Sequence, residues 1–240
     1  MDEVGTFVNT GIDLKNFKKL TASEKKDLLK EVLEKNITIS FKFTDSPVYK
    51  VKFINGKKWS ILSAKKPANF SGSYHQEMAT IIVPVDQERY FFVSRVQVNS
   101  QLIHFSSDIE IYHLHRRSMR RTAVPSIYPA YFMIKKVHGS LSFLKAIVID
   151  VSDQGMKIAL NSEVPPLKPG FEILGTLRLG TRRGIEIKAR IKHHKNFSNS
   201  AMKQVFGLEI EDMSEHSRSI YRNQLLDLQR DLFTIFMSKG

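Results

Sequence analysis

The residues with the strongest chemical potential in this chain are four arginines within six positions: Arg116, Arg117, Arg120 and Arg121. A guanidinium group can bind a phosphate, or the O6/N7 edge of a guanine, through two parallel hydrogen bonds, whereas a lysine offers a point charge. The cluster therefore indicates a site for a small anion that also carries guanine-like edges.

A short Asp-x-Ser-x-x-Gly pattern follows, with Asp150 placed 29 positions after Arg121 and then Ser152 and Gly155. Asp150 offers a carboxylate that can accept hydrogen bonds from ring N–H groups, and Ser152 adds a hydroxyl. Gly155 leaves the backbone free to come close and is expected to permit a tight turn. Alone, an arginine cluster is more often a solvated basic linker, and these three residue types make turns in many proteins. Their order and separation favour a binding site.

The bulk composition describes a globular protein with a strong positive charge. The 240 residues include 42% hydrophobic residues and no cysteine, and the formal net charge is +13. Between residues 111 and 149 there are seven Lys or Arg residues and no Asp or Glu. Such a charge attracts nucleic acids, anionic membrane surfaces, acidic proteins or phosphorylated small molecules. The start lacks the pattern of a signal peptide, and no run of about 18 apolar residues follows. We expect a cytoplasmic protein without membrane insertion.

The first half of the chain is predicted to be a small β-barrel domain over residues 1–113. Thr21 and Glu24 form a capping-box pattern that predicts a helix over residues 22–35. Alternating apolar and polar residues then indicate strands, with a turn at Asn55-Gly56. The predicted strands are residues 37–43, 48–54, 59–62, 79–85, 90–98 and 102–112.

The second half, residues 114–240, repeats this style and is predicted to be a second barrel. Its short β-rich runs are residues 131–137, 142–150, 155–160, 172–179, 185–193 and 205–210, bounded by Gly, Pro or Asn. From Ser214 onward, apolar residues recur at helical spacing, which predicts a C-terminal helix that either packs on the barrel or pairs with another chain. The predicted fold class is mainly β, with two small barrels, a leading helix and a C-terminal helix.

The second half resembles the PilZ domain family, bacterial receptors for cyclic di-GMP. The matching residues are Arg117-x-x-x-Arg121 preceded by Arg116, then Asp150-x-Ser152-x-x-Gly155, and Phe206-Gly207-Leu208-Glu209-Ile210 before the final helix. The likeness covers residues 114–225. A β-rich domain directly before the arginines resembles the YcgR type of flagellar brake protein, whose N-terminal domain is also a small barrel.

This resemblance implies a cyclic di-GMP site formed by Arg116, Arg117, Arg120, Arg121, Asp150, Ser152 and Gly155. Arg117 and Arg121 would bind phosphate or guanine, Asp150 would accept from a guanine N–H edge, and Ser152 would add a polar contact. The register Arg116-x-x-x-Arg120 fits the motif as literally, and Val124 favours Arg117-x-x-x-Arg121 because the family begins its first strand there. Arg120 then points to solvent. An arginine at the position of Arg116 implies a stacked pair of ligands, so we expect two cyclic di-GMP molecules per chain.

The implied function is a cyclic di-GMP effector that changes its interdomain arrangement on ligand binding and regulates a protein partner. The resemblance points to flagellar motor components as that partner, with recruitment to the flagellar basal body. A basic nucleic-acid-binding β-barrel protein is the alternative. The sequence lacks G-x-S-x-G, P-loop and G-x-G-x-x-G motifs, so we predict neither an enzyme nor a resident cofactor. His113 and His115 share a strand face without an evident third ligand, so no metal site is predicted. A monomer and a homodimer both remain open.

Overall fold

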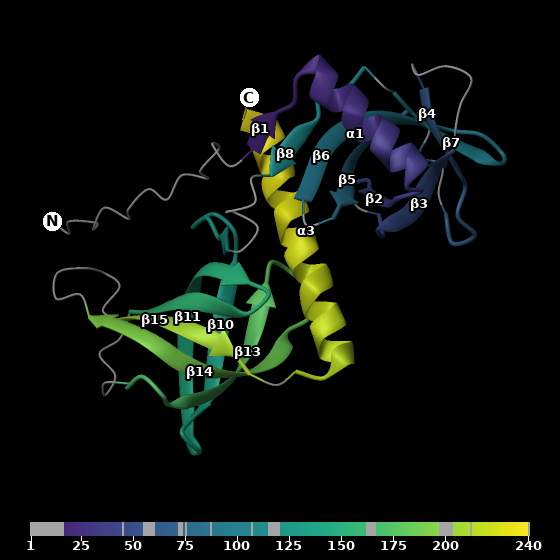
Figure 1. The fold of residues 1–240 in the computed structure, drawn as a ribbon. Helices are drawn as coiled ribbons and strands as arrows, with labels where there is room; N and C mark the ends of the chain where they lie inside the picture. Colours follow the sequence, from purple (N-terminus) through teal and green to yellow (C-terminus); the bar gives the residue numbers. More distant parts are fainter. Residues whose placement is uncertain are drawn as a thin grey trace, which may run out of the picture. The chain divides into compact units, whose positions relative to one another are not determined.

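The chain forms two compact units, residues 15–116 and residues 117–240 (Figure 1). The computed structural model describes residues 17–44, 46–54, 61–71, 74, 76–86, 88–106, 108–114, 121–161, 167–196, 204–211 and 213–239. The predicted domain boundary between residues 113 and 114 stays a prediction, because residues 115–120 lie outside the described residues. The predicted turn at Asn55-Gly56 also lies outside them.

The first unit contains a closed six-stranded barrel. Its elements are β1 (Phe17–Lys19), α1 (Ala22–Glu34), β2 (Thr38–Lys42), β3 (Tyr49–Ile54), β4 (Ile61–Lys65), β5 (Met78–Val85), β6 (Glu88–Val98), β7 (Leu102–Ser106) and β8 (Tyr112–Leu114). The strand order β6-β5-β2-β3-β4-β7 closes through antiparallel pairing of β6 with β7. β8 and then β1 extend the sheet from β6.

Alternation along these strands and capping at α1 explain why the segments fold as they do. In β3 every second residue from Tyr49 is buried, as expected for a strand with one face on a core. The predicted capping box is confirmed: the Thr21 side chain accepts from the Glu24 backbone N–H, and the Glu24 side chain accepts from the Thr21 backbone N–H. Leu28 and Val32 then pack α1 into the barrel core.

The predicted continuous strand over residues 102–112 is wrong. β7 ends at Ser106 after pairing with β4 and β6, and β8 starts at Tyr112. Residues 108–111, between the two strands, form hydrogen bonds elsewhere. The Ile109 carbonyl accepts from the Lys25 ammonium, and the Ile111 carbonyl accepts from the Leu20 N–H. These bonds to residues in and just before α1 take the place of sheet pairing. No local sequence pattern predicts them, because the partners are far apart in the sequence. The short strand β1 was not predicted from the sequence.

The second unit contains another closed six-stranded barrel with a long helix. Its elements are β9 (Thr122–Ala123), β10 (Ala130–Val137), β11 (Ser140–Ser152), β12 (Gly155–Leu160), β13 (Glu172–Leu179), β14 (Ile185–Asn196), β15 (Gln204–Ile210) and α3 (Glu215–Lys239). The order β10-β13-β14-β15-β12-β11 closes through pairing of β10 with β11. β9 adds to β11 beyond the point where β10 ends. The predicted mainly β fold with two barrels and two helices is therefore confirmed.

The C-terminal helix α3, yellow in Figure 1, belongs to the core of the second unit. Tyr221, Leu225, Leu228 and Leu232 are buried in one cluster with inward-facing residues of the barrel strands. Their spacing of three to four residues places them on one helix face, as the sequence pattern predicts. Of the two predicted alternatives for this helix, packing on its own barrel is the one that the structure shows.

Charged groups also hold α3 against the barrel. Arg182, which follows β13, donates to Asp231 at 2.7 Å and lies 3.5 Å from Asp227, both on α3. The Tyr128 hydroxyl donates to the same Asp231 carboxylate at 3.0 Å. These groups are half-buried, so the loss of one partner would leave another charge poorly solvated. Among the described residues, no helix has both the length and the hydropathy needed to cross a bilayer.

Substitution of Leu228 tests the contribution of α3 to this core. Leu228 is fully buried, so Leu228→Ala should lower the free energy of unfolding by about 2–5 kcal/mol in urea titrations of the full chain. Ile220→Ala, at an exposed position on the same helix, should cost about 0.5 kcal/mol or less. Equal losses in the two variants would show that α3 does not pack as described.

Candidate ligand-binding site

Strand pairing brings the two predicted motif halves together on the second barrel. Asp150 and Ser152 lie at the end of β11, just after an irregularity in its register with β12 between Val148 and Asp150. β9 pairs with this same part of β11, with Ala123 opposite Asp150 and Thr122 opposite Val151. Because Arg121 directly precedes β9, this pairing places Arg121 beside Asp150.

The two halves are in contact through an ion pair with a long N–O distance. The Arg121 Nη1 atom lies 3.7 Å from the Asp150 Oδ1 atom, beyond a good hydrogen bond. The Arg121 side chain is 64% exposed and the Asp150 side chain 18%. Arg121 is therefore free to reorient toward a ligand, whereas Asp150 is held in the barrel wall. Arg116, Arg117 and Arg120 lie outside the described residues, so their roles stay predictions.

Asp150 carries an unsatisfied acceptor. Within the part of the chain that the structure describes, the buried Oδ1 atom has no hydrogen-bond donor. Burial raises the pKa of Asp150, and the positive charges of Arg121 and Lys157 and a hydrogen bond from the Lys157 backbone oppose that rise. A carboxylate oxygen that is buried without a donor is costly for the folded state. A ligand N–H group at this point would supply the missing donor.

Ser152 and Gly155 form the turn that follows Asp150. The Ser152 hydroxyl donates to the Gly155 carbonyl at 3.1 Å, across a hairpin whose two turn residues are Asp153 and Gln154. Gly155 ends this tight turn without a positive φ, and the expected close approach of its backbone is made to a neighbouring strand. The glycine is required by packing: an added Cβ atom would lie 2.2 Å from the Leu208 carbonyl oxygen on β15.

Two side chains of α3 form hydrogen bonds at both motif halves, one to a backbone carbonyl and one to a side-chain hydroxyl. The Tyr221 hydroxyl donates to the Ser152 carbonyl at 2.7 Å. The Gln229 side-chain amide donates to the Thr122 hydroxyl at 3.1 Å, one residue after Arg121. Tyr221, Gln229 and Thr122 are all buried, so these bonds are protected from water. Sequence reasoning missed Tyr221 and Gln229 as site-positioning residues, because their partners lie 69 and 107 residues away.

Beside Asp150, the strands β12, β15 and β14 form part of the barrel wall, and a glycine on β15 leaves one position of this wall without a side chain. Lys157 on β12 stands opposite Asp150, Gly207 on β15 stands opposite Lys157, and His193 on β14 stands opposite Gly207. Gly207 contributes no side chain to this row, and a Cβ there would meet the His193 ring at 3.4 Å. Next to the unsatisfied carboxylate, these paired positions therefore hold a cation, a glycine without a side chain and an imidazole ring that lies near the glycine.

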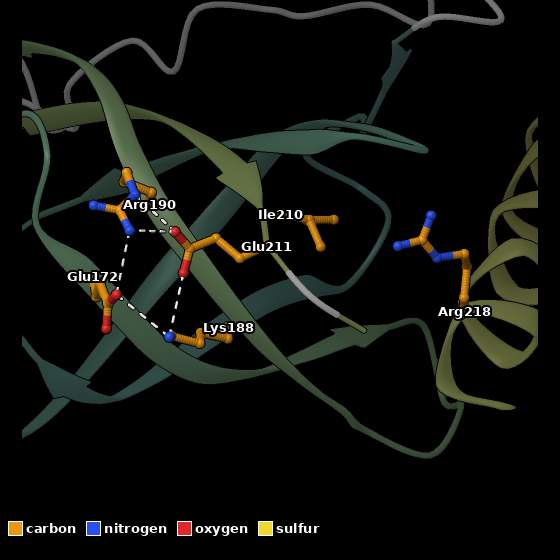
Figure 2. A pocket seen from close by; sticks show the side chains of 6 residues that line it. All are labelled: Glu172, Lys188, Arg190, Ile210, Glu211 and Arg218. Carbon is orange, nitrogen blue, oxygen red and sulfur yellow. Dashed lines mark hydrogen bonds and ion pairs between the residues drawn. The ribbon is translucent and has the colours of Figure 1, made fainter. Parts of the chain in front are cut away.

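Two basic residues beside a second cavity are already paired with carboxylates. A cavity of about 400 Å³ is lined by Glu172, Lys188, Arg190, Ile210, Glu211 and Arg218 (Figure 2). The figure shows Lys188 and Arg190 bridged to the two carboxylates: Lys188 lies 3.3 Å from Glu172, and Arg190 lies 2.6 Å from Glu211. Since Arg182 is also bound to α3, charge compensation disfavours Lys188, Arg190 and Arg182 as principal anion-binding groups.

One of the two histidines that could have suggested a metal contacts other side chains. The His113 Nε2 atom lies 2.6 Å from a Glu88 carboxylate oxygen, and the His113 ring stacks on Tyr90. His115 lies outside the described residues.

Comparison with known proteins finds a family match that lies largely within the second unit. Residues 115–227 match the family model described as the PilZ domain. No protein of curated function matches the chain. Similar solved structures include K. pneumonia MrkH with c-di-GMP, at 13% identity and a TM-score of 0.40, covering 93% of this chain and 100% of that one. Escherichia coli YcgR with c-di-GMP has 14% identity and a TM-score of 0.41, covering 96% and 100%. The Bacillus subtilis inhibitor of motility, MotI/DgrA, has 17% identity and a TM-score of 0.35, covering 79% and 96%.

The buried carboxylate predicts a pH-dependent gain in stability for Asp150→Asn. Because burial raises the pKa of Asp150 above its ordinary 3.8, its favourable contribution is complete below that value and is lost as pH rises through the folded-state pKa. Asp150→Asn should therefore raise the free energy of unfolding near pH 7 and give no comparable gain near about pH 3. The lost ion pair costs little, since Arg121 is largely exposed.

Urea unfolding at several pH values measures this effect. Asp153→Asn is the matched control, because Asp153 is an exposed carboxylate in the adjacent turn. A loss of stability at neutral pH in Asp150→Asn, or an equal gain in both variants, would contradict the argument.

Proposed function

We propose that this protein binds cyclic di-GMP on the outer wall of its second barrel, because residues 115–227 match the PilZ domain family model. The observation that carries the proposal is the buried Asp150 Oδ1 atom without a donor, placed 3.7 Å from the Arg121 guanidinium. A guanine presents N–H donors on one edge and the O6 and N7 acceptors on another. Asp150 is suited to the first edge and arginine to the second, or to a phosphate.

Each predicted site residue then has a physical role. Arg117 and Arg121 bind the phosphates or the guanine O6/N7 edge, and Asp150 accepts from the guanine N–H edge. Ser152 holds the turn through its bond to the Gly155 carbonyl, and its half-buried side chain gives a polar contact. Gly155 lets β15 approach the turn closely. The exposed Arg121 side chain can close over the ligand without breaking a strong interaction, because its present ion pair is long and solvated.

The proposed role is that of an effector rather than an enzyme. Arg116–Arg121 stand between β8 of the first unit and β9 of the second in the sequence, so binding of the ligand by this segment would change the arrangement of the two units. That change would regulate a protein partner in the cytoplasm. Flagellar motor components at the basal body are the partner that the likeness to the YcgR type implies.

Cyclic di-GMP titration by calorimetry tests the ligand and the residues. Wild type should bind, and Arg121→Ala and Asp150→Asn should each weaken binding by about tenfold or more, as expected for loss of one bidentate or charged guanine contact. Arg95→Ala, an exposed arginine of the first unit, should bind like wild type. GTP and single-stranded DNA serve as competing ligands. Binding of DNA without binding of cyclic di-GMP would favour a nucleic-acid-binding protein and sink the proposal.

The same method tests the stoichiometry. We propose that Arg116 holds a second, stacked ligand, so wild type should bind two molecules per chain and Arg116→Ala one. Arg120→Ala should leave two, because in the register Arg117-x-x-x-Arg121 we expect the Arg120 side chain to point to solvent. One molecule bound to wild type, or loss of the second molecule in Arg120→Ala with retention in Arg116→Ala, would contradict this register.

A further inference from the structure

An apolar row on the outside of the second barrel has no role in the core or in the ligand site. Six large apolar side chains are exposed among the described residues, and three of them, Leu141, Phe143 and Ile147, lie on β11. With Lys145 they occupy alternate positions along β11, and all four are exposed although the pairing with β10 shifts register between Leu141 and Leu144. We call Leu141, Phe143, Lys145 and Ile147 the β11 row.

Folding does not account for this row. The side chains between its members, such as Ala146, are buried or half-buried on the inner side, and Ala146 and Val148 belong to the core cluster. Leu141 is 72% exposed and Phe143 78% exposed, so neither gains from burial in the folded chain. Adjacent exposed apolar side chains on a soluble protein commonly mark an interaction surface.

The electrostatics of the row restrict what can cover it. Residues 130–149 include Lys135, Lys136 and Lys145 and no acidic residue. Lys135 is paired with Glu186 at 2.9 Å. The Lys145 ammonium instead lies 4.8 Å from the centre of the Tyr131 ring, and among the described residues it takes part in no ion pair. The row therefore places one positive charge between Phe143 and Ile147.

This central charge disfavours two occupants. Insertion into a lipid bilayer would bury the Lys145 ammonium with the apolar side chains that flank it, which is costly. A second copy of the chain would bring like charges together, because residues 130–149 carry no carboxylate to match the lysines. A protein segment that places a carboxylate between apolar side chains satisfies both the charge and the apolar surface.

We propose that the β11 row is a docking surface for an acidic, amphipathic segment of a partner protein. The apolar side chains of that segment would pack against Leu141, Phe143 and Ile147, and its carboxylate would pair with Lys145. This proposal does not depend on cyclic di-GMP binding, since none of the four residues is in the proposed ligand site.

An NMR titration of the full-length protein, without cyclic di-GMP, tests the proposal. The probe is a capped peptide, Val-Thr-Glu-Thr-Val-Thr-Val, which in extended form presents Val, Glu, Val and Val on one side at the spacing of the row. The matched peptide has Lys in place of Glu. The amide signals of residues 141–147 should shift with the Glu peptide, which should bind at least about fivefold more tightly than the Lys peptide.

Variants assign the effect to the row. Lys145→Glu should reverse the preference between the two peptides. Phe143→Ser should weaken binding of the Glu peptide by about tenfold, whereas Ile127→Ser, at another exposed apolar position of the same unit, should leave it unchanged. These positions are exposed, so the variants should stay folded.

Four results would overturn the proposal. Equal binding of the two peptides, or an unchanged preference in Lys145→Glu, would exclude recognition of an acidic segment. Binding to phosphatidylglycerol vesicles that requires Phe143, without peptide binding, would identify a membrane surface instead. Concentration-dependent dimerisation that Phe143→Ser abolishes, without peptide binding, would assign the row to a second copy of the chain.

Discussion

The pairing of β9 with β11 is the constraint on which the candidate site depends. Two residues of β9 suffice to set Ala123 opposite Asp150, and this fixes where the preceding arginine can lie. The pairing brings an exposed cation beside a carboxylate held in the barrel wall, although the two stand far apart in the sequence. An unsatisfied buried oxygen is a cost in the folded chain that a suitable ligand can relieve. Binding sites commonly carry such costs. The unsatisfied acceptor of Asp150 is therefore consistent with its proposed role.

The helix α3 connects the stability of the barrel with the geometry of this site. Its apolar face completes the core, and Asp227 and Asp231 bind Arg182 on the barrel. The same helix forms hydrogen bonds beside both motif halves: Tyr221 donates to the Ser152 carbonyl and Gln229 to the Thr122 hydroxyl. A displacement of α3 would therefore alter the strand β9 and the turn after β11 together. Rigid support of this kind keeps a binding site near its productive geometry before a ligand arrives.

Charge compensation distinguishes Lys188, Arg190 and Arg182 from Arg121. Lys188 and Arg190 share Glu172 and Glu211, and Arg182 shares the carboxylates of α3. These cations already have partners in the folded protein, so an anion would have to compete for them. Residues 111–149 have no acidic residue of their own, and the Arg121 contact with Asp150 is long. The net charge of the chain thus says less about binding than the places where positive charge is left uncompensated.

Local sequence patterns determined the elements, because a strand with one buried face alternates and a helix with one buried face repeats every three to four residues. They also determined the residue types of the site and the resemblance to PilZ domains. Barrel closure, the break after Ser106 and the two-residue strand β9 were decided by long-range hydrogen bonds that leave no local signal. For the same reason, three features of the site were shown only by the tertiary structure. Gly155 packs against the Leu208 carbonyl, Tyr221 donates to the Ser152 carbonyl, and the Asp150 Oδ1 atom lacks a donor among the described residues. Sequence spacing can propose which groups act together, but distance and burial decide what each of them still needs.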